Sequence, residues 1–338
     1  VRAAYQSTIA NPAQPDAFVA QLSSPGSRLI SSTFLGGSQY DGAYSVAVEG
    51  EAVYLTGDTY STDFPTRLAR QAGNAGDYDA FLSRLLVPPE PNAAPWIYDY
   101  NGDGTSDIAV FRPSTGMWSV RNLTRVYLGS SSDDAVPADY DGDGTTDVAV
   151  FRDSAGLWSV RSLTRFYLGA AGDQPAPGDY DGNGTAAAGI FRDPSGLWSV
   201  RELTRVYLGS TGDRAIPGYY GGSGSRQIAV FRGSTGLWSV RSLTRFYLGL
   251  STDGLVPGDY SGSGRWEGGI FRSSAALWAI RNLTRIYLGA AGDWAQPADY
   301  DGDGVDEAAV FRDSTGLWSV LGLTRVYFGA TGDVPATR

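Results

Sequence analysis

The 338-residue sequence contains no cysteine, no histidine and no lysine, and it has a single methionine, Met117. Without cysteine, the chain can form neither a disulfide framework nor a thiolate zinc site. The absence of histidine removes the commonest general base, and the absence of lysine removes Schiff-base chemistry. A pair of carboxylates for glycoside cleavage stays open, because acidic residues are plentiful. We therefore expect a protein that is not an enzyme.

Positive charge and long apolar runs are also scarce. The net charge is −10, and all 26 basic residues are arginine. So acidic a chain should be repelled by phosphate backbones and anionic membrane surfaces, which argues against nucleic acid as a partner. No apolar run approaches the roughly 18 residues of a membrane span, so we expect no membrane insertion. The chain opens at Val1 without a signal-peptide pattern, and we expect a soluble mature segment.

The sequence is dominated by a 40-residue unit that recurs six times without insertion or deletion, seen most plainly from Asp139 to Gly178. A fixed period of this length without a helical pattern is typical of a propeller or solenoid, in which each unit buries its faces against its neighbours. Tryptophan recurs in one column, at Trp118, Trp158, Trp198, Trp238, Trp278 and Trp318.

Each unit predicts four short strands, which in the second copy cover 136–141, 146–152, 157–161 and 164–169. Bulky residues lie on both faces of these strands, as expected for a sheet between two others. Further strands are predicted ahead of the repeats, over 17–22, 28–34, 44–49 and 52–58. The fold class is therefore all-β, a β-propeller of four-stranded blades.

A second repeat type precedes the first, because Asp79-Ala80-Phe81-Leu82 repeats Asp16-Ala17-Phe18-Val19. Together with the phrases at 32–37 and 44–66, these residues resemble the bacterial SBBP-type β-propeller repeat, which implies about one blade. We expect an irregular arm at 1–15, a blade region at 16–86, a proline-rich junction at 87–95 and six blades at 96–338. The predicted ring has seven blades, and the alternative is a six-bladed propeller with a small N-terminal β subdomain.

Acidic side chains gather in the loop ahead of the second strand of each unit. The second copy reads Asp-Tyr-Asp-Gly-Asp-Gly-Thr-Thr-Asp over 139–147. Oxygen-bearing side chains at loop positions 1, 3, 5 and 9 can surround one hard cation, and position 7 adds a backbone carbonyl. Asp-Gly pairs also form plain hairpin turns, but so many crowded carboxylates would repel one another without a cation. The sequence therefore predicts Ca²⁺ loops.

Three copies keep the full set of ligands, and a fourth keeps part of it. The predicted ligands in the full copies are Asp99, Asn101, Asp103, Thr105 and Asp107, then Asp139, Asp141, Asp143, Thr145 and Asp147, and then Asp299, Asp301, Asp303, Val305 and Glu307. The third copy has the weaker set Asp179, Asp181 and Asn183, with Ala187 at position 9. Strands around the other loops persist, which favours a structural role for calcium.

The loop and the strand after it, DYDGDGTTDVAVFR and its copies, resemble the FG-GAP and VCBS family of calcium-binding propeller repeats, of the kind found in integrin α-subunit heads. The resemblance implies a propeller with calcium loops on one rim, and it names no partner. We expect an extracellular or cell-surface protein of a prokaryote that binds protein or glycan, with self-assembly possible.

Aromatic and basic columns leave two interpretations open. The tryptophan column fits packing between blades, and sugar stacking is the alternative. Trp96, Trp266 and Trp294 lie outside that column and are the better candidates for ligand contact. The two arginine columns, which begin at Arg112 and Arg125, fit ion pairs with carboxylates, and a sixfold anion site is the alternative. The first functional hypothesis is an adhesion, assembly or interaction module, and the second is a propeller lectin.

Overall fold

The computed structural model describes residues 6, 8–22, 29–49, 52–66, 71, 73–74, 76–86, 98–222 and 224–336. The chain divides into two compact units, Val1–Pro91 and Asn92–Arg338. The predicted junction at 87–95, which includes that boundary, and Trp96 lie outside the described residues. Within the described ranges, no helix is long and apolar enough to cross a membrane.

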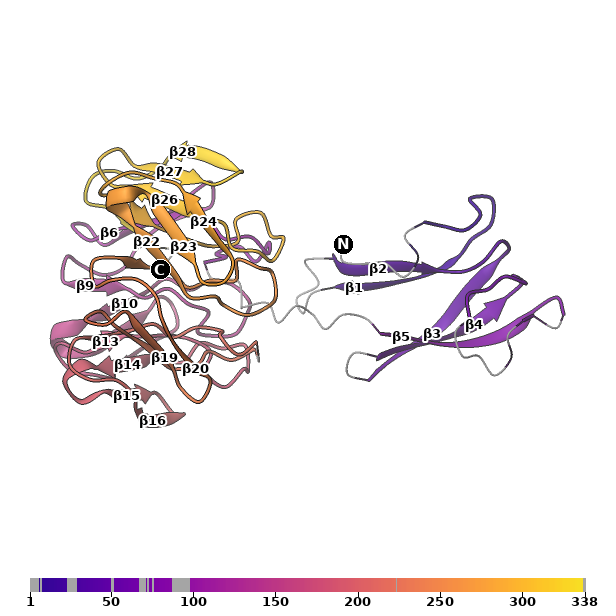
Figure 1. The fold of residues 1–338 in the computed structure, drawn as a ribbon, viewed down its shortest axis with the longest axis horizontal. Coiled ribbons are helices and arrows are strands. Elements are labelled where there is room, and N and C mark those ends of the chain that lie inside the picture. The colour runs from indigo at the N-terminus through magenta and orange to yellow at the C-terminus, as the bar shows by residue number, and fades with distance from the viewer. Residues whose placement is uncertain are drawn as a thin grey trace. The chain divides into compact units, whose positions relative to one another are not determined.

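The larger unit consists of six four-stranded antiparallel sheets (Figure 1), so the prediction of an all-β propeller is confirmed. The first sheet contains β29 (Val334–Pro335), β6 (Ala109–Arg112), β7 (Met117–Val120) and β8 (Thr124–Tyr127). The second contains β9 (Asp133–Ala135), β10 (Ala149–Arg152), β11 (Leu157–Val160) and β12 (Thr164–Tyr167), and the third contains β13 (Gln174–Pro175), β14 (Gly189–Arg192), β15 (Leu197–Val200) and β16 (Thr204–Tyr207).

The remaining sheets repeat this order. The fourth contains β17 (Asp213–Ala215), β18 (Ala229–Arg232), β19 (Leu237–Val240) and β20 (Thr244–Tyr247), and the fifth contains β21 (Gly254–Leu255), β22 (Gly269–Arg272), β23 (Leu277–Ile280) and β24 (Thr284–Tyr287). The sixth contains β25 (Trp294–Ala295), β26 (Ala309–Arg312), β27 (Leu317–Val320) and β28 (Thr324–Tyr327). Short 3-10 turns follow three second strands, at Asp153–Ala155, Asp193–Ser195 and Ser273–Ala275.

The predicted third and fourth strands lie where the sequence places them and the second is shorter, beginning at Ala149 and not at residue 146, whereas the first strand lies elsewhere. In the second copy it occupies Asp133–Ala135 and not 136–141. Pro137 follows it and has no N–H to donate to a ladder, so the pairing continues only through the Val136 N–H, which bonds to the Ala149 carbonyl at 2.9 Å, and an isolated bridge between Ala138 and Asp147. The segment after the first strand therefore leads directly into the acidic loop.

The six sheets form a closed ring. β29, from the C-terminal end, pairs with β6, with Val334 opposite Phe111. One backbone hydrogen bond then joins each acidic loop to the next, such as Thr146 N–H to the Asp99 carbonyl at 2.6 Å, and the last returns from Ser106 to the Asp299 carbonyl at 2.7 Å. Because the sixth sheet bonds to the first, the described part of the chain shows the six-bladed alternative rather than the seven-bladed ring.

Buried aromatic rings fill the spaces between neighbouring sheets. Trp118 is fully buried, and its sheet packs through Phe111 and Trp118 against Val148 and Val150 of the next sheet. The Trp118 indole N–H donates to the Leu128 carbonyl at 3.0 Å, so its one polar group is satisfied. All six tryptophans of the column are equally buried, which confirms packing as their role.

The smaller unit contains two sheets. β1 (Ala17–Leu22) and β2 (Leu29–Leu35) form a hairpin, and β3 (Asp41–Glu49), β4 (Ala52–Thr59) and β5 (Asp79–Leu86) form a three-stranded sheet. In the described part of the predicted irregular arm, Gln6 bonds to β2 through its carbonyl, which accepts the Phe34 N–H at 3.1 Å.

Candidate metal centre

The acidic loops share one backbone conformation. In the second copy, both oxygens of the Asp139 carboxylate accept backbone hydrogen bonds, from Gly142 at 2.7 Å and from Gly144 at 2.9 Å. Both glycines have positive φ, 78° and 88°, a conformation that costs other residues free energy. The carboxylate at position 1 therefore holds the loop in a curve that turns the later side chains toward a common centre.

The sixth and second copies bring carboxylates together. Oxygens of Asp299, Asp301, Asp303 and Glu307 all lie within 4.8 Å of one another. In the second copy, Asp139, Asp141 and Asp147 meet the same condition. Two oxygens bound to one Ca²⁺ at about 2.4 Å can be at most about 4.8 Å apart, so both groups fit a single Ca²⁺, and all their donors are the hard oxygens that it prefers.

Two predicted side-chain ligands are held by hydrogen bonds inside their loops. Asp143 accepts bonds from the Thr145 N–H and hydroxyl, both at 2.7 Å, and lies outside the second group of carboxylates. In the first copy, Asp103 accepts the Thr105 hydroxyl at 2.6 Å and the Asn101 amide at 3.0 Å. The first copy thus forms no described group of three carboxylates, since Asn101 provides an amide where the second and sixth copies have an aspartate.

The sixth copy has valine at loop position 7, where the first and second copies have threonine. Val305, Thr105 and Thr145 each donate their backbone N–H to the carboxylate at position 5. Their carbonyl oxygens are the groups that could bind a cation, so the side chain at this position can vary. This explains how Val305 replaces threonine without changing the loop.

Crowding and burial raise the pKa of several loop carboxyls. Burial is the main cause at Glu307, whose pKa rises to about 8, and the neighbouring acids Asp301 and Asp299 raise it further. The pKa of Asp299 rises to about 6, also chiefly through burial. The same cause raises the pKa of Asp147 and of Asp107 to about 6. A bound dication would favour the charged form of each group, so these loops have the electrostatic character of a cation site.

The other three loops keep the two glycines of positive φ but have fewer acids, and the fourth has Tyr219 in place of the first aspartate. The third copy retains both backbone bonds to Asp179, while Ala187 provides no oxygen at position 9. In the fifth, the Ser261 hydroxyl donates a hydrogen bond to Glu267 at 2.8 Å, whereas a loop with two acids at these positions would have two carboxylates that could share a cation. In the fourth, the Gln227 amide oxygen accepts the Gly221 N–H at 2.7 Å. No group of three carboxylates occurs among the described residues of these loops.

A cluster around Arg226 is the main feature that the sequence analysis missed. The guanidinium lies 5.4 Å from the Tyr219 ring and 5.5 Å from the Trp266 ring, and it donates to the Pro177 carbonyl at 2.8 Å. A Cβ at Gly178 would collide with Arg226. Glycine at 178, 218 and 258 therefore admits the large side chains Arg226, Trp266 and Asp306, a covariation between neighbouring copies that the sequence contains.

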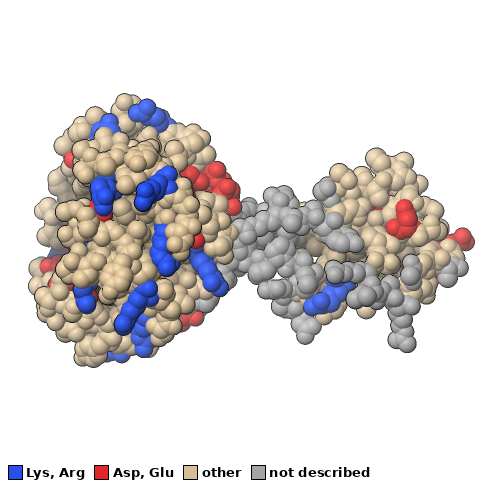
Figure 2. Space-filling model, viewed as in Figure 1, with Lys and Arg blue, Asp and Glu red and all other residues tan. Residues whose placement is uncertain are grey.

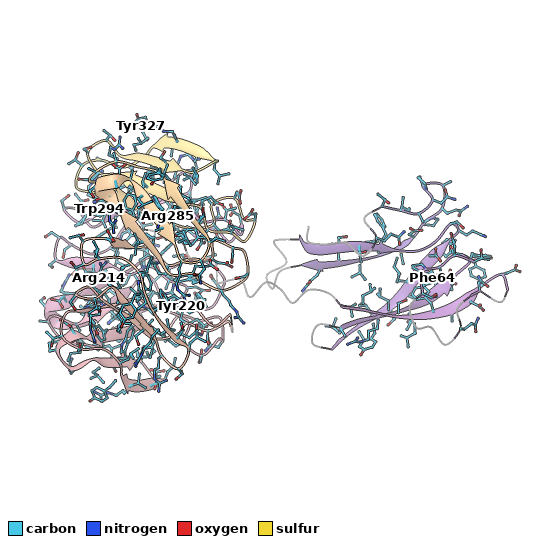
Figure 3. All side chains as sticks on the ribbon, viewed as in Figure 1. Phe64, Arg214, Tyr220, Arg285, Trp294 and Tyr327 are labelled. Atoms are coloured by element: carbon cyan, nitrogen blue, oxygen red, sulfur yellow. The ribbon has the colours of Figure 1, made fainter. Side chains whose placement is uncertain are left out.

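The two candidate ligand tryptophans lie in different settings. Trp266 is half-buried and packs edge-on against Tyr219 and Tyr220, with ring centroids at 5.5 and 6.4 Å. Trp294 is 43% exposed on the first strand of the sixth sheet (Figure 3). Of the two, only Trp294 presents much of its surface to solvent.

The two arginine columns also lie in different environments. Arg152 and its equivalents form two-pronged ion pairs with a buried aspartate that begins the first strand or directly precedes it, such as Asp133 at 2.6 and 2.8 Å. The second column, Arg125 and its equivalents, is exposed, and arginines are spread over the face of the larger unit seen in Figure 2. The outer strands also expose a tyrosine each, of which Tyr327 is 75% exposed (Figure 3).

Comparison with known proteins adds structural similarities only. No protein-family model and no curated protein matches the chain. A lectin of Agrocybe aegerita that recognises non-reducing terminal N-acetylglucosamine is 14% identical, with 94% of this chain and 93% of the lectin covered and a TM-score of 0.44. BBS1N in complex with ARL6DN is 12% identical, with 68% and 78% covered and a TM-score of 0.44. Similarities this distant identify no ligand for the chain.

Proposed function

We propose that the larger unit is a calcium-binding β-propeller that acts, without catalysis, as an adhesion, assembly or protein-interaction module outside a prokaryotic cell. The group formed by Asp299, Asp301, Asp303 and Glu307 is the observation that carries this proposal. The FG-GAP and VCBS resemblance of the same loops supports it. Extracellular modules bind Ca²⁺ with dissociation constants of about 10⁻⁴ to 10⁻³ M, which suits loops with few acids in an environment rich in the ion.

The loop residues would act as a structural clamp. Asp299 curves the loop through its two backbone bonds, and Asp301, Asp303 and Glu307 offer the remaining carboxylate oxygens. Bound Ca²⁺ would supply the positive charge that offsets their mutual repulsion. Because each loop bonds to the next, an ordered loop would hold its neighbour in place, which gives the partner a rigid rim.

Calcium binding is tested by thermal unfolding and calorimetry of the full chain. Free Ca²⁺ at ten times a site's dissociation constant should stabilise the fold by about 1.4 kcal/mol per site, and EDTA should remove that gain. The double variant Asp301→Asn and Asp303→Asn should lose one bound ion. Asp134→Asn, an exposed acid outside the loops, is the matched control and should bind like the unchanged protein. Equal ion counts for both variants, or no heat of binding at millimolar Ca²⁺, would contradict the proposal.

A lectin is the second candidate function, and exposed aromatic rings favour it. Trp294 and the outer-strand tyrosines offer flat apolar faces on which sugars can stack. A glycan array that gives a signal competed by free sugar would place this function first. Trp294→Ala should then abolish binding, while Leu250→Ala, another exposed apolar residue, should not. Turnover of a polysaccharide, lost on changing one carboxylate outside the loops, would show that the protein is an enzyme after all.

A further inference from the structure

The smaller unit contains an open groove beside β1. Its volume is about 500 Å³, and it is lined by β1, β3 and β4, without a charged side chain. Several of its lining residues are apolar yet exposed: Phe18 by 66%, Val46 by 61% and Val48 by 68%. Neighbouring apolar side chains with this much exposure mark an interaction site or an aggregation hazard.

The groove exists because the hairpin covers only part of the sheet beneath it. By register, Val46 lies opposite Leu55 and Val48 opposite Val53, so these pairs of neighbours share one face of the three-stranded sheet. Leu55 and Val53 are buried under the hairpin, where they pack with Val19 and Leu35. The β3 half of that face is left open, and one more strand beside β1 would cover it.

Within the described residues, β1 pairs only with β2, so its other edge has the backbone groups for such a strand. Phe18 lies opposite Phe34 in the hairpin, but the Phe34 N–H points away from β1 and bonds to the Gln6 carbonyl. Phe18 and Phe34 are therefore a non-hydrogen-bonded pair of the antiparallel ladder. The N–H and C=O groups of Phe18 and Ala20 therefore point away from β2, into the groove. No described residue forms a backbone hydrogen bond with them.

Internal repetition indicates what kind of strand fits. The same phrase, Asp-Ala-Phe, leads into β1 at 16–18 and begins β5 at 79–81. β5 pairs along its whole length with β4, and Phe81 packs on Phe64 with ring centroids 4.7 Å apart. Phe18, the counterpart of Phe81, lacks such cover. The neighbour of β1 should therefore resemble β4, whose residues Val53 to Gly57 are uncharged like the groove.

We propose that the groove binds one β-strand of a different protein, and not of a second copy of this chain, that carries a repeat of the same type as β3 to β5. The strand adds to the free edge of β1, and its alternating apolar side chains cover Val46 and Val48. Its own backbone groups bond to those of Phe18 and Ala20. This inference concerns the smaller unit alone, so its failure would leave the calcium proposal untouched.

The test uses the full chain and a labelled peptide with the sequence of 52–59, AVYLTGDT. Fluorescence polarisation should show saturable binding that is lost when the peptide carries proline in place of its tyrosine, because proline cannot donate to the edge. Val46→Lys with Val48→Lys should weaken binding at least 10-fold. Leu82→Lys, also an exposed apolar residue of this unit but outside the groove, should bind normally.

Three results would overturn the proposal. One is no binding at millimolar peptide, and another is equal binding to all three proteins. The last is a dimer of the unchanged chain, seen by light scattering and lost in the Val46 and Val48 variant, because the groove would then be filled by a second copy. Circular dichroism of each variant confirms that the sheets are intact before binding is compared.

Discussion

At the scale of single residues, the loop carboxyls connect stability to pH. Glu307 has a pKa of about 8 in the folded chain against an ordinary value of 4.5, and Asp147 has about 6 against 3.8. The metal-free folded state thus holds protons more tightly than the unfolded state does. This contribution to stability is complete below the ordinary values and is lost as the pH rises to about 8.

We therefore expect the melting temperature in EDTA to fall between pH 5 and pH 8. Calcium should raise it more at pH 8, where the carboxylates are charged, than at pH 5. Glu307→Gln should flatten the EDTA profile, while Glu202→Gln, which changes an exposed acid in a turn outside the loops, serves as control. A melting temperature in EDTA that rose with pH, together with an equal calcium effect at both values, would contradict this interpretation.

At the scale of the element, the fourth loop shows packing where other loops carry acids. Tyr219 replaces the first aspartate, and Arg226 and Trp266 close around it. Arg226→Ala should lower the free energy of unfolding by about 1–2 kcal/mol, through the lost cation–π contacts and the lost bond to Pro177.

Because neither described group of carboxylates lies in the loop of Arg226 or in the third-copy loop to which it bonds, the calcium response of this variant should match that of the unchanged chain in calorimetry. Arg205→Ala, which removes an exposed arginine of an outer strand, should leave both the stability and the ion count unchanged. A loss of bound Ca²⁺ on removing Arg226 would show that the cluster supports the metal loops and not only its own sheets.

Elements differ in how far the sequence predicts them. The second to fourth strands have period-2 patterns that depend only on local sequence, and the tryptophan column fixes which face is buried. First strands are only two or three residues long, as in Gln174–Pro175, and leave too little pattern to place them. The spacing of the acids predicts the groups of carboxylates. It does not predict that Asp143 accepts hydrogen bonds from Thr145, because a carboxylate in such a loop can either accept bonds from the loop or point toward the centre of the cation site.

At the scale of the whole molecule, closure depends on a contact that no local pattern contains. Asp333 pairs with Arg112, 221 positions away, whereas equivalent pairs such as Asp173 with Arg192 are 19 apart. The sequence alone does not decide between seven blades and six, because the number of strands does not show which strands share a sheet. The pairing of β29 with β6 shows the arrangement.

The ion pair between Asp333 and Arg112, which closes the ring, should contribute more to the free energy of unfolding than the equivalent pairs do. Asp333→Ala should cost about 1–3 kcal/mol from the lost charged hydrogen bonds, plus the free energy of loosening the ring. Asp173→Ala removes the same bonds inside one continuous sheet and is the matched control. Urea unfolding followed by tryptophan fluorescence measures both. An equal or larger loss for Asp173→Ala would show that closure adds nothing to the pair.

The strand that completes the first sheet also sets an order of events in the cell. Val334 leaves the ribosome 225 residues after Ala109, which at about 5–20 residues per second is a delay of roughly 10–45 s. Throughout that interval β6 lacks its neighbour β29 while the strands of the five other sheets are synthesised. Final assembly of the propeller therefore waits for its last strand, and a chaperone or an early docking partner would find its opportunity in the seconds before that strand arrives.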